Sequence, residues 1–289
     1  MDNSGRTIVV TGATGRQGGA VARHLLSDGW RVRALTRKPE GAPARRLASL
    51  GAEVIKVNLV DRASLRPAFA GAYGVYSVQN PMIGGVDGEV VQGRNVADVA
   101  REAGVSHVVY GSAGIDSTPT GVPSWDSKLA VEDHMRALGL PLTVLRPMAF
   151  MELMTDKDLY PAVAMWHLMP KFAGEALPIG WICVDDVGAI AARAFATPDA
   201  FIGADLRLTA DVRSVAECRD IWHSVMGRRP RRVQMPVWLF RRFVGNDLIT
   251  MWRWLRPADL VFDPTPTRTA LPNALSVRDW LVGRRQRAR

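Results

Sequence analysis

Short runs of apolar and β-branched residues alternate, in the first half of the chain, with longer segments whose apolar residues recur every three or four positions. The short runs predict buried strands at 7–11, 31–36, 53–57, 74–78, 107–111 and 142–146. The longer segments predict helices, most clearly at 18–27, 87–103 and 125–138. Repeated strand–helix units of this kind pack as a parallel sheet with helices on both faces. The pattern therefore predicts an α/β fold with a doubly wound, Rossmann-type domain.

This alternation stops after Pro147, where Met, Trp and Pro become frequent. We expect the first domain to span residues 1–150 and a smaller α+β domain to span residues 151–289. Residues 179–198 resemble one further strand and helix, which we expect to rejoin the first domain. Within the second domain, residues 237–260 place Trp and Phe among Arg at a spacing typical of a helix.

The composition of the chain is ordinary for a globular protein, with 289 residues of which 47% are apolar and 22% charged. Residues 1–6 are polar and run directly into the first strand, so no signal peptide is expected. No apolar stretch reaches the roughly 18 residues that cross a bilayer. Cys183 and Cys218 lie far apart and accompany no metal-ligand spacing. We therefore expect a cytoplasmic protein with two buried thiols, no bound metal and no membrane contact.

The net charge of +9 gathers in the last third, where residues 212–289 carry 16 Arg against 6 acidic residues. The Arg residues come in short clusters, which is typical of a solvated basic surface. An anionic partner, acidic lipid or nucleic acid, is the alternative. No helix-turn-helix pattern is present, which argues against direct nucleic-acid binding. The sequence leaves open a protein partner and an oligomer.

Three glycines at three-residue spacing follow the first strand and open the first helix. Gly12 permits a tight turn, Gly15 lets the backbone approach a pyrophosphate, and Gly18 lets the helix pack closely on the strand. The N-terminus of the helix offers unpaired N–H groups to phosphate. This pattern predicts a dinucleotide site in which the intervening side chains also take part; these are Thr14, Arg16 and Gln17.

The residues after the second strand indicate which dinucleotide is bound. NAD-binding proteins usually place an acid there to bond the ribose 2′-hydroxyl. Arg37 and Lys38 occupy that place instead, and their positive charge suits a 2′-phosphate. We therefore expect NADP(H), with an exposed basic turn as the alternative. Further cofactor contacts are expected at the ends of the later strands, namely at Asn58, Leu59, Val78, Gln79 and Ser112.

Five motifs occur in order along the chain: TGATGRQG at 11–18, LTR at 35–37, WDSKLAVE at 125–132, LRPMAFME at 145–152 and VRDWL at 277–281. Together they resemble the NmrA-like family of atypical short-chain dehydrogenases/reductases. The resemblance implies a Rossmann domain that carries NADP(H) and a small C-terminal domain that binds substrate. The family includes quinone reductases and also regulators that bind the cofactor.

Short-chain dehydrogenases carry a proton-donating Tyr four residues before a Lys, which holds the nicotinamide ribose. In this chain Lys128 stands in the motif and Ser124 takes the place of the Tyr. Ser has too high a pKa to replace a phenol well, so ketone reduction is in doubt. The candidates for catalysis are Lys128, Ser124 and Ser112. An ion pair between Lys128 and Glu132, four residues later, is the structural alternative.

Three functions are compatible with these features. The first is an NADPH-dependent oxidoreductase that passes hydride to an apolar or aromatic carbonyl or quinone-like acceptor. The Met- and Trp-rich segment motivates it, because such side chains suit aromatic ligands. The second is a regulator that senses NADP(H) and acts through a protein partner, and the third is a biosynthetic enzyme without net redox change. The expected substrate-pocket residues are Trp125, Met148, Phe150, Met151 and Trp166.

Overall fold

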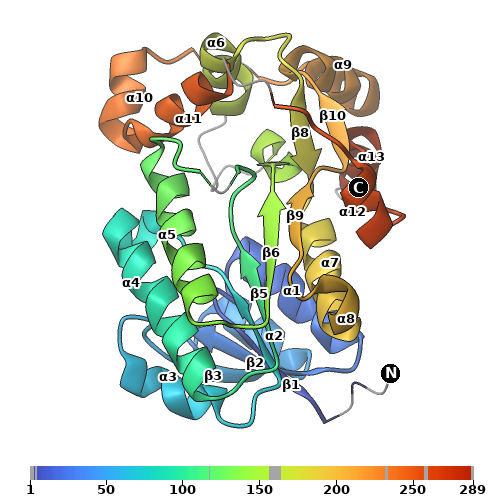
Figure 1. Cartoon of the computed structure of the whole chain (residues 1–289). Coiled ribbons are helices and arrows are strands. Elements are labelled where there is room, and N and C mark those ends of the chain that lie inside the picture. Colours follow the sequence, from blue (N-terminus) through green and yellow to red (C-terminus); the bar gives the residue numbers. More distant parts are fainter. Residues whose placement is uncertain are drawn as a thin grey trace. The chain divides into compact units, whose positions relative to one another are not determined.

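The computed structural model describes residues 3, 5–116, 118–155, 164–231, 234–256 and 260–287. The chain forms two compact units (Figure 1). The first unit comprises Met1–Pro119, Ser124–Arg146 and Val184–Leu206. The second unit comprises Thr120–Pro123, Pro147–Cys183 and Arg207–Arg289.

A seven-stranded sheet forms the centre of the first unit, in the order β3-β2-β1-β4-β5-β6-β9. The strands are β1 (Thr7–Val10), β2 (Arg31–Thr36), β3 (Glu53–Lys56), β4 (Gly74–Ser77), β5 (His107–Gly111), β6 (Leu142–Pro147) and β9 (Asp205–Leu208). The pairs from β3 across to β6 are all parallel. The order reverses direction between β1 and β4, as a doubly wound sheet requires. The structure thus confirms the α/β Rossmann-type fold.

Helices cover both faces of this sheet. They are α1 (Arg16–Ser27), α2 (Ala42–Ser49), α3 (Arg62–Phe69), α4 (Pro81–Glu102), α5 (Pro123–Ala137), α7 (Val184–Ala196) and α8 (Pro198–Phe201). Helix α1 packs against α7 and α2, and α3 packs against α4. The apolar core on the α3, α4 and α5 side includes Val9, Phe69, Val75, Val96 and Val131, all at most 4% exposed. Burial of the central strands on both faces explains why they are continuous apolar runs rather than alternating ones.

Two glycines shape helix α4 and its contact with α5. Gly85 has φ 75° and ψ 175°, so the helix is kinked after its first turn. Gly93 lies against Val131 of α5, where an added Cβ would come within 2.4 Å of a Val131 methyl carbon. Non-bonded carbons normally stay about 3.5–4.0 Å apart, so only glycine permits the two helices to approach this closely. The contact brings the residues one turn earlier on each helix together.

The second unit contains a three-stranded sheet, in the order β10-β8-β7. Its strands are β7 (Ala149–Phe150), β8 (Ile179–Ile182) and β10 (Asp211–Arg213). Its helical elements are η1 (Met151–Met154), η2 (Ala164–Leu168), α6 (Met169–Ala173), α9 (Val215–Met226), α10 (Val237–Val244), α11 (Asp247–Leu255), α12 (Thr265–Ala270) and α13 (Val277–Arg287). The expected strand near 180 therefore belongs to this sheet, and the chain returns to the first unit only with α7.

Aromatic packing accounts for many of the Trp and Phe residues in the second unit. Trp252 stacks on both Phe172 and Phe240, with ring centroids 6.3 and 5.9 Å apart. Cys183 and Cys218 are buried free thiols, as the sequence predicts. Burial raises the pKa of the Cys218 thiol well above its usual value, so this thiol is inert rather than reactive.

Candidate functional site

The turn between β1 and α1 is built from glycine at every position that the pattern requires. Gly12 has φ +59°, and its carbonyl accepts a hydrogen bond from the Gly15 N–H at 2.8 Å. A Cβ at Gly18 would lie 2.4 Å from the Gly12 carbonyl oxygen and 2.6 Å from that of Thr11. Backbone atoms cannot move aside as a flexible side chain can, so Gly18 permits the close approach of helix and strand.

The N-terminus of α1 has backbone N–H groups that no side chain caps. Its N-cap residue is Gly15, no side chain caps it, and no acidic residue lies in its first turn. The first N–H groups of a helix have no partner within the helix, and together they carry a partial positive charge. This end of a twelve-residue helix therefore suits a phosphate group.

Arg37 and Lys38 directly follow β2 and are exposed. Within the part of the chain that the structure describes, the Arg37 guanidinium has no carboxylate partner, so its fork of N–H donors is available to an anion. The backbone N–H of Lys38 donates to the Thr36 hydroxyl at 3.1 Å, and that hydroxyl lies 3.4 Å from the Thr14 hydroxyl of the glycine turn. The basic pair is thus tied to the glycine turn through two threonines.

The end of β4 is fixed to the end of β1 by the Thr11 hydroxyl, which donates to the Val78 carbonyl at 3.0 Å and accepts from the Val78 N–H at 2.8 Å. The next residue, Gln79, is 5% exposed, and its side-chain nitrogen donates to the Ser77 hydroxyl at 3.0 Å. Its side-chain oxygen is buried without a hydrogen-bond partner. A buried polar atom of this kind costs free energy unless something binds it, and the described residues provide no partner for this oxygen.

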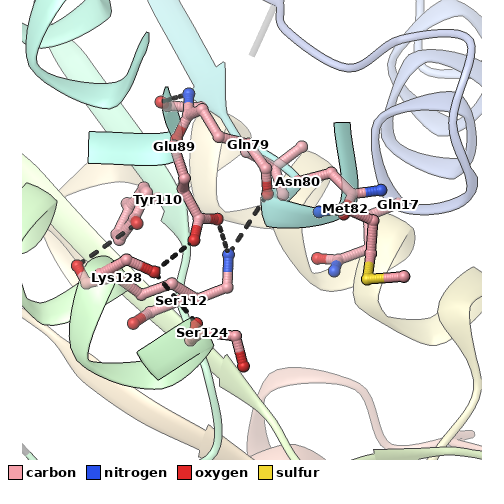
Figure 2. A network of polar contacts seen from close by, with 12 residues as sticks. Gln17, Gln79, Asn80, Met82, Glu89, Tyr110, Ser112, Ser124 and Lys128 are labelled. Carbon is pink, nitrogen blue, oxygen red and sulfur yellow. Dashed lines mark hydrogen bonds and ion pairs between the residues drawn. The ribbon is translucent and has the colours of Figure 1, made fainter. Parts of the chain in front are cut away.

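Lys128 lies on α5 and reaches the end of β4, where it meets Glu89 of α4 (Figure 2). The Lys128 Nζ donates to Glu89 Oε1 at 2.7 Å and to the Gln79 carbonyl at 3.3 Å. The other carboxylate oxygen of Glu89 accepts from the Ser127 hydroxyl at 2.5 Å. The Glu89 side chain is fully buried and that of Lys128 is 13% exposed. The ion pair between Lys128 and Glu132, which is the structural alternative for this lysine, is not formed among the described residues.

Glu132 is instead part of a second buried network. It accepts from Arg146 at 2.7 Å and from Arg136 at 2.9 Å, and Arg146 also pairs with Asp205. Ser112, just after β5, lies 3.5 Å from both Glu132 and Arg146 and is 2% exposed. The Ser112 hydroxyl therefore contacts a structural ion pair. Ser112 itself lies at the carboxyl end of β5, at the same edge of the sheet as the ends of β1 and β4.

Ser124 and Trp125 occupy the first turn of α5 and are half-buried. The Ser127 hydroxyl, which donates to Glu89, also lies 3.2 Å from the Ser124 carbonyl. Tyr110 of β5 donates to the Lys128 carbonyl at 3.4 Å, and its ring is fully buried. Burial raises the pKa of Tyr110 well above its usual value, and the nearby Glu89 raises it further. Tyr110 therefore does not supply the missing acidic phenol.

The remaining residues expected at the cofactor have local roles as well. Gln17 accepts from the Tyr76 hydroxyl at 3.1 Å, and Arg16 begins helix α1. Asn58 is exposed after β3, where its side chain accepts from the Val60 N–H at 3.4 Å. The half-buried Leu59 accepts through its carbonyl from Asn95 at 3.0 Å. The Asn58 side chain thus shapes a turn at the expected edge of the sheet.

The other expected substrate residues belong to the second unit. Met148 and Phe150 are half-buried, which leaves part of each side chain accessible. Met151 is fully buried and Trp166 is 3% exposed. The Trp166 indole donates to the Met154 carbonyl at 3.3 Å, and its ring packs edge-on against Trp222 at 5.5 Å. These contacts give Met151 and Trp166 a structural role in the core of this unit.

Sequence reasoning missed Glu89. The signal was present, because Glu89 lies on the same face of α4 as the buried residues Gly93, Val96, Ala97 and Ala100. An acid at a core position of an amphipathic helix requires a buried cationic partner. That requirement could have linked Glu89 to Lys128, which is one of only five lysines in the chain.

Neither a metal centre nor a membrane span emerges from the described residues. Among them, no group of three or more His, Cys, Asp or Glu side chains is arranged to hold a metal ion. None of the helices described combines the length and apolar character needed to traverse a bilayer.

The chain is similar to known proteins over most of its length. The chain is 30% identical over 264 residues to the NmrA-like family domain-containing oxidoreductase malD of Malbranchea aurantiaca, covering 83% of this chain and 78% of that protein. Its fold matches a crystal structure of NmrA, a negative transcriptional regulator, in complex with NADP (TM-score 0.76, 21% identity, 97% of this chain and 95% of that one). It also matches Citrobacter sp. triphenylmethane reductase complexed with NADP(H) (TM-score 0.74, 20% identity, 96% and 99%).

The model of the NmrA-like family matches residues 4–269, which is most of the chain. That range includes both the glycine turn and the Glu89–Lys128 pair, and it extends well into the second unit. The protein therefore belongs to the NmrA-like family.

Proposed function

We propose that this protein binds NADP(H) and reduces a flat, apolar acceptor of the quinone or aromatic carbonyl class. The observation that carries the proposal is the uncapped N-terminus of α1 behind the glycine turn, followed after β2 by the Arg37 guanidinium, which has no carboxylate partner among the described residues. The first feature suits a pyrophosphate and the second a 2′-phosphate. The relatives and fold neighbours named as oxidoreductases or reductases support the same activity.

The residues present fit the cofactor on structural grounds. A side chain at Gly18 would collide with backbone atoms of the turn, so glycine lets the first turn of α1 lie directly against the turn that would hold the pyrophosphate. The Lys128 amine donates to the backbone carbonyl of Gln79 at the end of β4, next to the strand that leads into the turn. This amine would bond the nicotinamide half at the ribose hydroxyls. NADPH, when bound, supplies the hydride.

The class of hydride acceptor that we propose follows from the lack of an acidic proton donor at Ser124 and Tyr110. Ser124 stands where a phenol would donate one, and Tyr110 is buried with a raised pKa. An acceptor whose reduced form is a stabilised anion, such as a hydroquinone anion, needs no donor from the protein because water can protonate it. The accessible part of Trp125, three residues before Lys128 on α5, is the apolar surface of the first unit that we propose for such a ligand.

A regulatory function is the second candidate, favoured by one observation. The Lys128 ammonium is already engaged by a buried carboxylate, and no acidic phenol stands beside it in the part of the chain that the structure describes. A protein that only senses the NADP(H) ratio, and acts through a protein partner, needs a cofactor site but no proton donor.

The experiment measures NADPH binding by calorimetry and then NADPH oxidation at 340 nm with a panel of quinones, enones and ketones. We expect turnover with quinones and little or none with simple ketones. Binding of NADPH without turnover of any acceptor would favour the regulator. Failure to bind NADPH at all would refute both functions.

A further inference from the structure

We propose that Glu89 is a positioning residue for the nicotinamide side of the site, acting through Lys128. In this arrangement the carboxylate holds the Lys128 amine at the end of β4, and it compensates the charge that the amine carries. The proposal rests on the proposed NADP(H) function, and it assigns to α4 a role that the motif on α5 does not reveal.

The geometry around the amine leaves one donor for a ligand. A lysine ammonium has three N–H donors. Two of them are taken in the structure, one by Glu89 Oε1 at 2.7 Å and one by the Gln79 carbonyl at 3.3 Å. The third has no acceptor among the residues that the structure describes, so it is available to an oxygen of a bound molecule. Because the first two bonds fix the direction of the third, Glu89 and Gln79 together aim the amine.

Glu89 is itself held from the other side. The Ser127 hydroxyl donates to Glu89 Oε2 at 2.5 Å, and Ser127 precedes Lys128 on the same helix. Consecutive residues of α5 thus bind the two oxygens of one carboxylate. The close contact of Gly93 with Val131, one turn further along both helices, sets the spacing at which this is possible.

The charges nearby make Glu89 the principal partner of the amine. Glu132, on the same helix as Lys128, is occupied by Arg146 and Arg136. An ammonium that is 13% exposed is costly without a counter-charge, and the fully buried carboxylate needs a cation equally. Because each compensates the other, Lys128 adds little net positive charge to its surroundings. It therefore holds a ligand hydroxyl in place rather than acidifying a neighbouring group, in agreement with acceptors that water can protonate.

The test compares Glu89→Gln, Lys128→Met and the double variant with wild type. Calorimetry measures the dissociation constants of NADPH and NADH. Loss of one charge-assisted hydrogen bond corresponds to about a tenfold change in affinity. We expect Glu89→Gln to weaken both dinucleotides about tenfold, because both contain the nicotinamide ribose. The double variant should bind no more weakly than Lys128→Met alone, since Glu89 acts through Lys128.

The matched control is Asp98→Asn. Asp98 on α4 hydrogen-bonds with His134 on α5 at 2.7 Å, so it is a polar contact between the same two helices but further from the site. It should leave both dissociation constants unchanged. A Glu89→Gln variant that is folded and binds NADPH as wild type does would overturn the proposal. So would additive effects of Glu89→Gln and Lys128→Met on affinity.

A second measurement needs no cofactor. The chain has five lysines, so labelling with an amine-reactive ester followed by peptide mass spectrometry resolves each one. We expect Lys128 to react about tenfold faster in Glu89→Gln than in wild type, with Lys38 and Lys56 unchanged. An unchanged rate at Lys128 would refute the pairing even if NADPH binds. A faster rate in a protein that does not bind NADPH would support the pairing and refute the proposed function alone.

Ser127→Ala provides a milder variant if Glu89→Gln does not fold. It removes only the hydroxyl that holds Glu89 Oε2. We expect it to weaken NADPH and NADH equally, by about twofold to threefold, and to accelerate the labelling of Lys128. Unchanged affinity together with unchanged labelling in this variant would count against the positioning role.

Discussion

Replacing Gly93 by Ala tests whether the close contact between α4 and α5 sets the geometry of the site. The new Cβ would lie 2.4 and 2.5 Å from the two methyl carbons of Val131. Carbon atoms normally approach to about 3.5–4.0 Å, so the helices must separate locally by about 1 Å. Glu89 and Ser127 lie one helical turn before Gly93 and Val131. A displacement of this size would stretch the 2.5 and 2.7 Å bonds of Glu89 beyond hydrogen-bonding distance.

We expect two consequences, which can be measured separately. Overpacking of a close-packed contact destabilises a protein by about 1–3 kcal/mol, which urea unfolding followed by circular dichroism would detect. The affinity for NADPH should also fall, because Lys128 loses its anchor. The double variant Gly93→Ala, Val131→Ala removes the two methyl groups that cause the collision. It should recover most of the affinity even though the smaller side chain at 131 leaves the core less well filled.

The control for this experiment is Gly88→Ala on the same helix. A Cβ at Gly88 has no atom within 4 Å. Ala is preferred to Gly inside a helix by about 0.5–1 kcal/mol, so this variant should be slightly more stable than wild type and bind NADPH unchanged. Equal stability and affinity in Gly93→Ala and Gly88→Ala would refute the reasoning. So would failure of Val131→Ala to rescue Gly93→Ala.

Three further predictions concern the cofactor cradle and the core. Arg37→Gln should weaken NADPH about tenfold or more and leave NADH unchanged by calorimetry, because only NADPH carries the 2′-phosphate; equal losses for both would contradict this assignment. Gly18→Ala should abolish binding of both dinucleotides, since its Cβ would lie 2.4 Å from backbone, and retained binding would show that the turn can relax. Burial lowers the pKa of His107 to about 4, so the unfolded chain binds a proton below about pH 6.5 while the folded one does not. The free energy of unfolding should therefore fall by up to about 3 kcal/mol between pH 6.5 and 4, and a His107→Gln variant, followed by urea unfolding at several pH values, should lack this component.

The sheet and the glycine turn could be predicted from the sequence because their signals are local. A buried parallel strand is an apolar run, and the expected strands agree with the observed ones to within one residue at each end. The helices 42–49 and 62–69 carried weaker patterns and were not specified, since each is only eight residues long. The cofactor specificity also rests on a local signal, namely a basic residue where an acid is usual.

The partner of Lys128 could not be predicted in this way, because it depends on packing between helices. Helical spacing places Glu132 within reach of Lys128, and the spacing alone cannot show that a buried guanidinium competes for it. Arg146 is 3% exposed at the end of β6 and pairs with both Glu132 and Asp205. Nor does the spacing show that Gly93 brings α4 close enough for Glu89 to reach the amine.

The buried carboxylates of Glu89 and Glu132, on neighbouring helices, bind cations of different shape: Glu89 binds Lys128 and Glu132 binds Arg146. A planar guanidinium presents a fork that can bind two carboxylates at once, and Arg146 does so with Glu132 and Asp205. The compact ammonium of Lys128 suits a single carboxylate oxygen and keeps a donor for a ligand. With the cations exchanged, the site would hold a guanidinium whose donors lie in one plane, and the core would hold an ammonium without the fork that binds both Glu132 and Asp205. This geometry explains why lysine stands on the cofactor side and arginine on the core side. We therefore expect Lys128→Arg, like Lys128→Met, to bind NADPH more weakly than wild type.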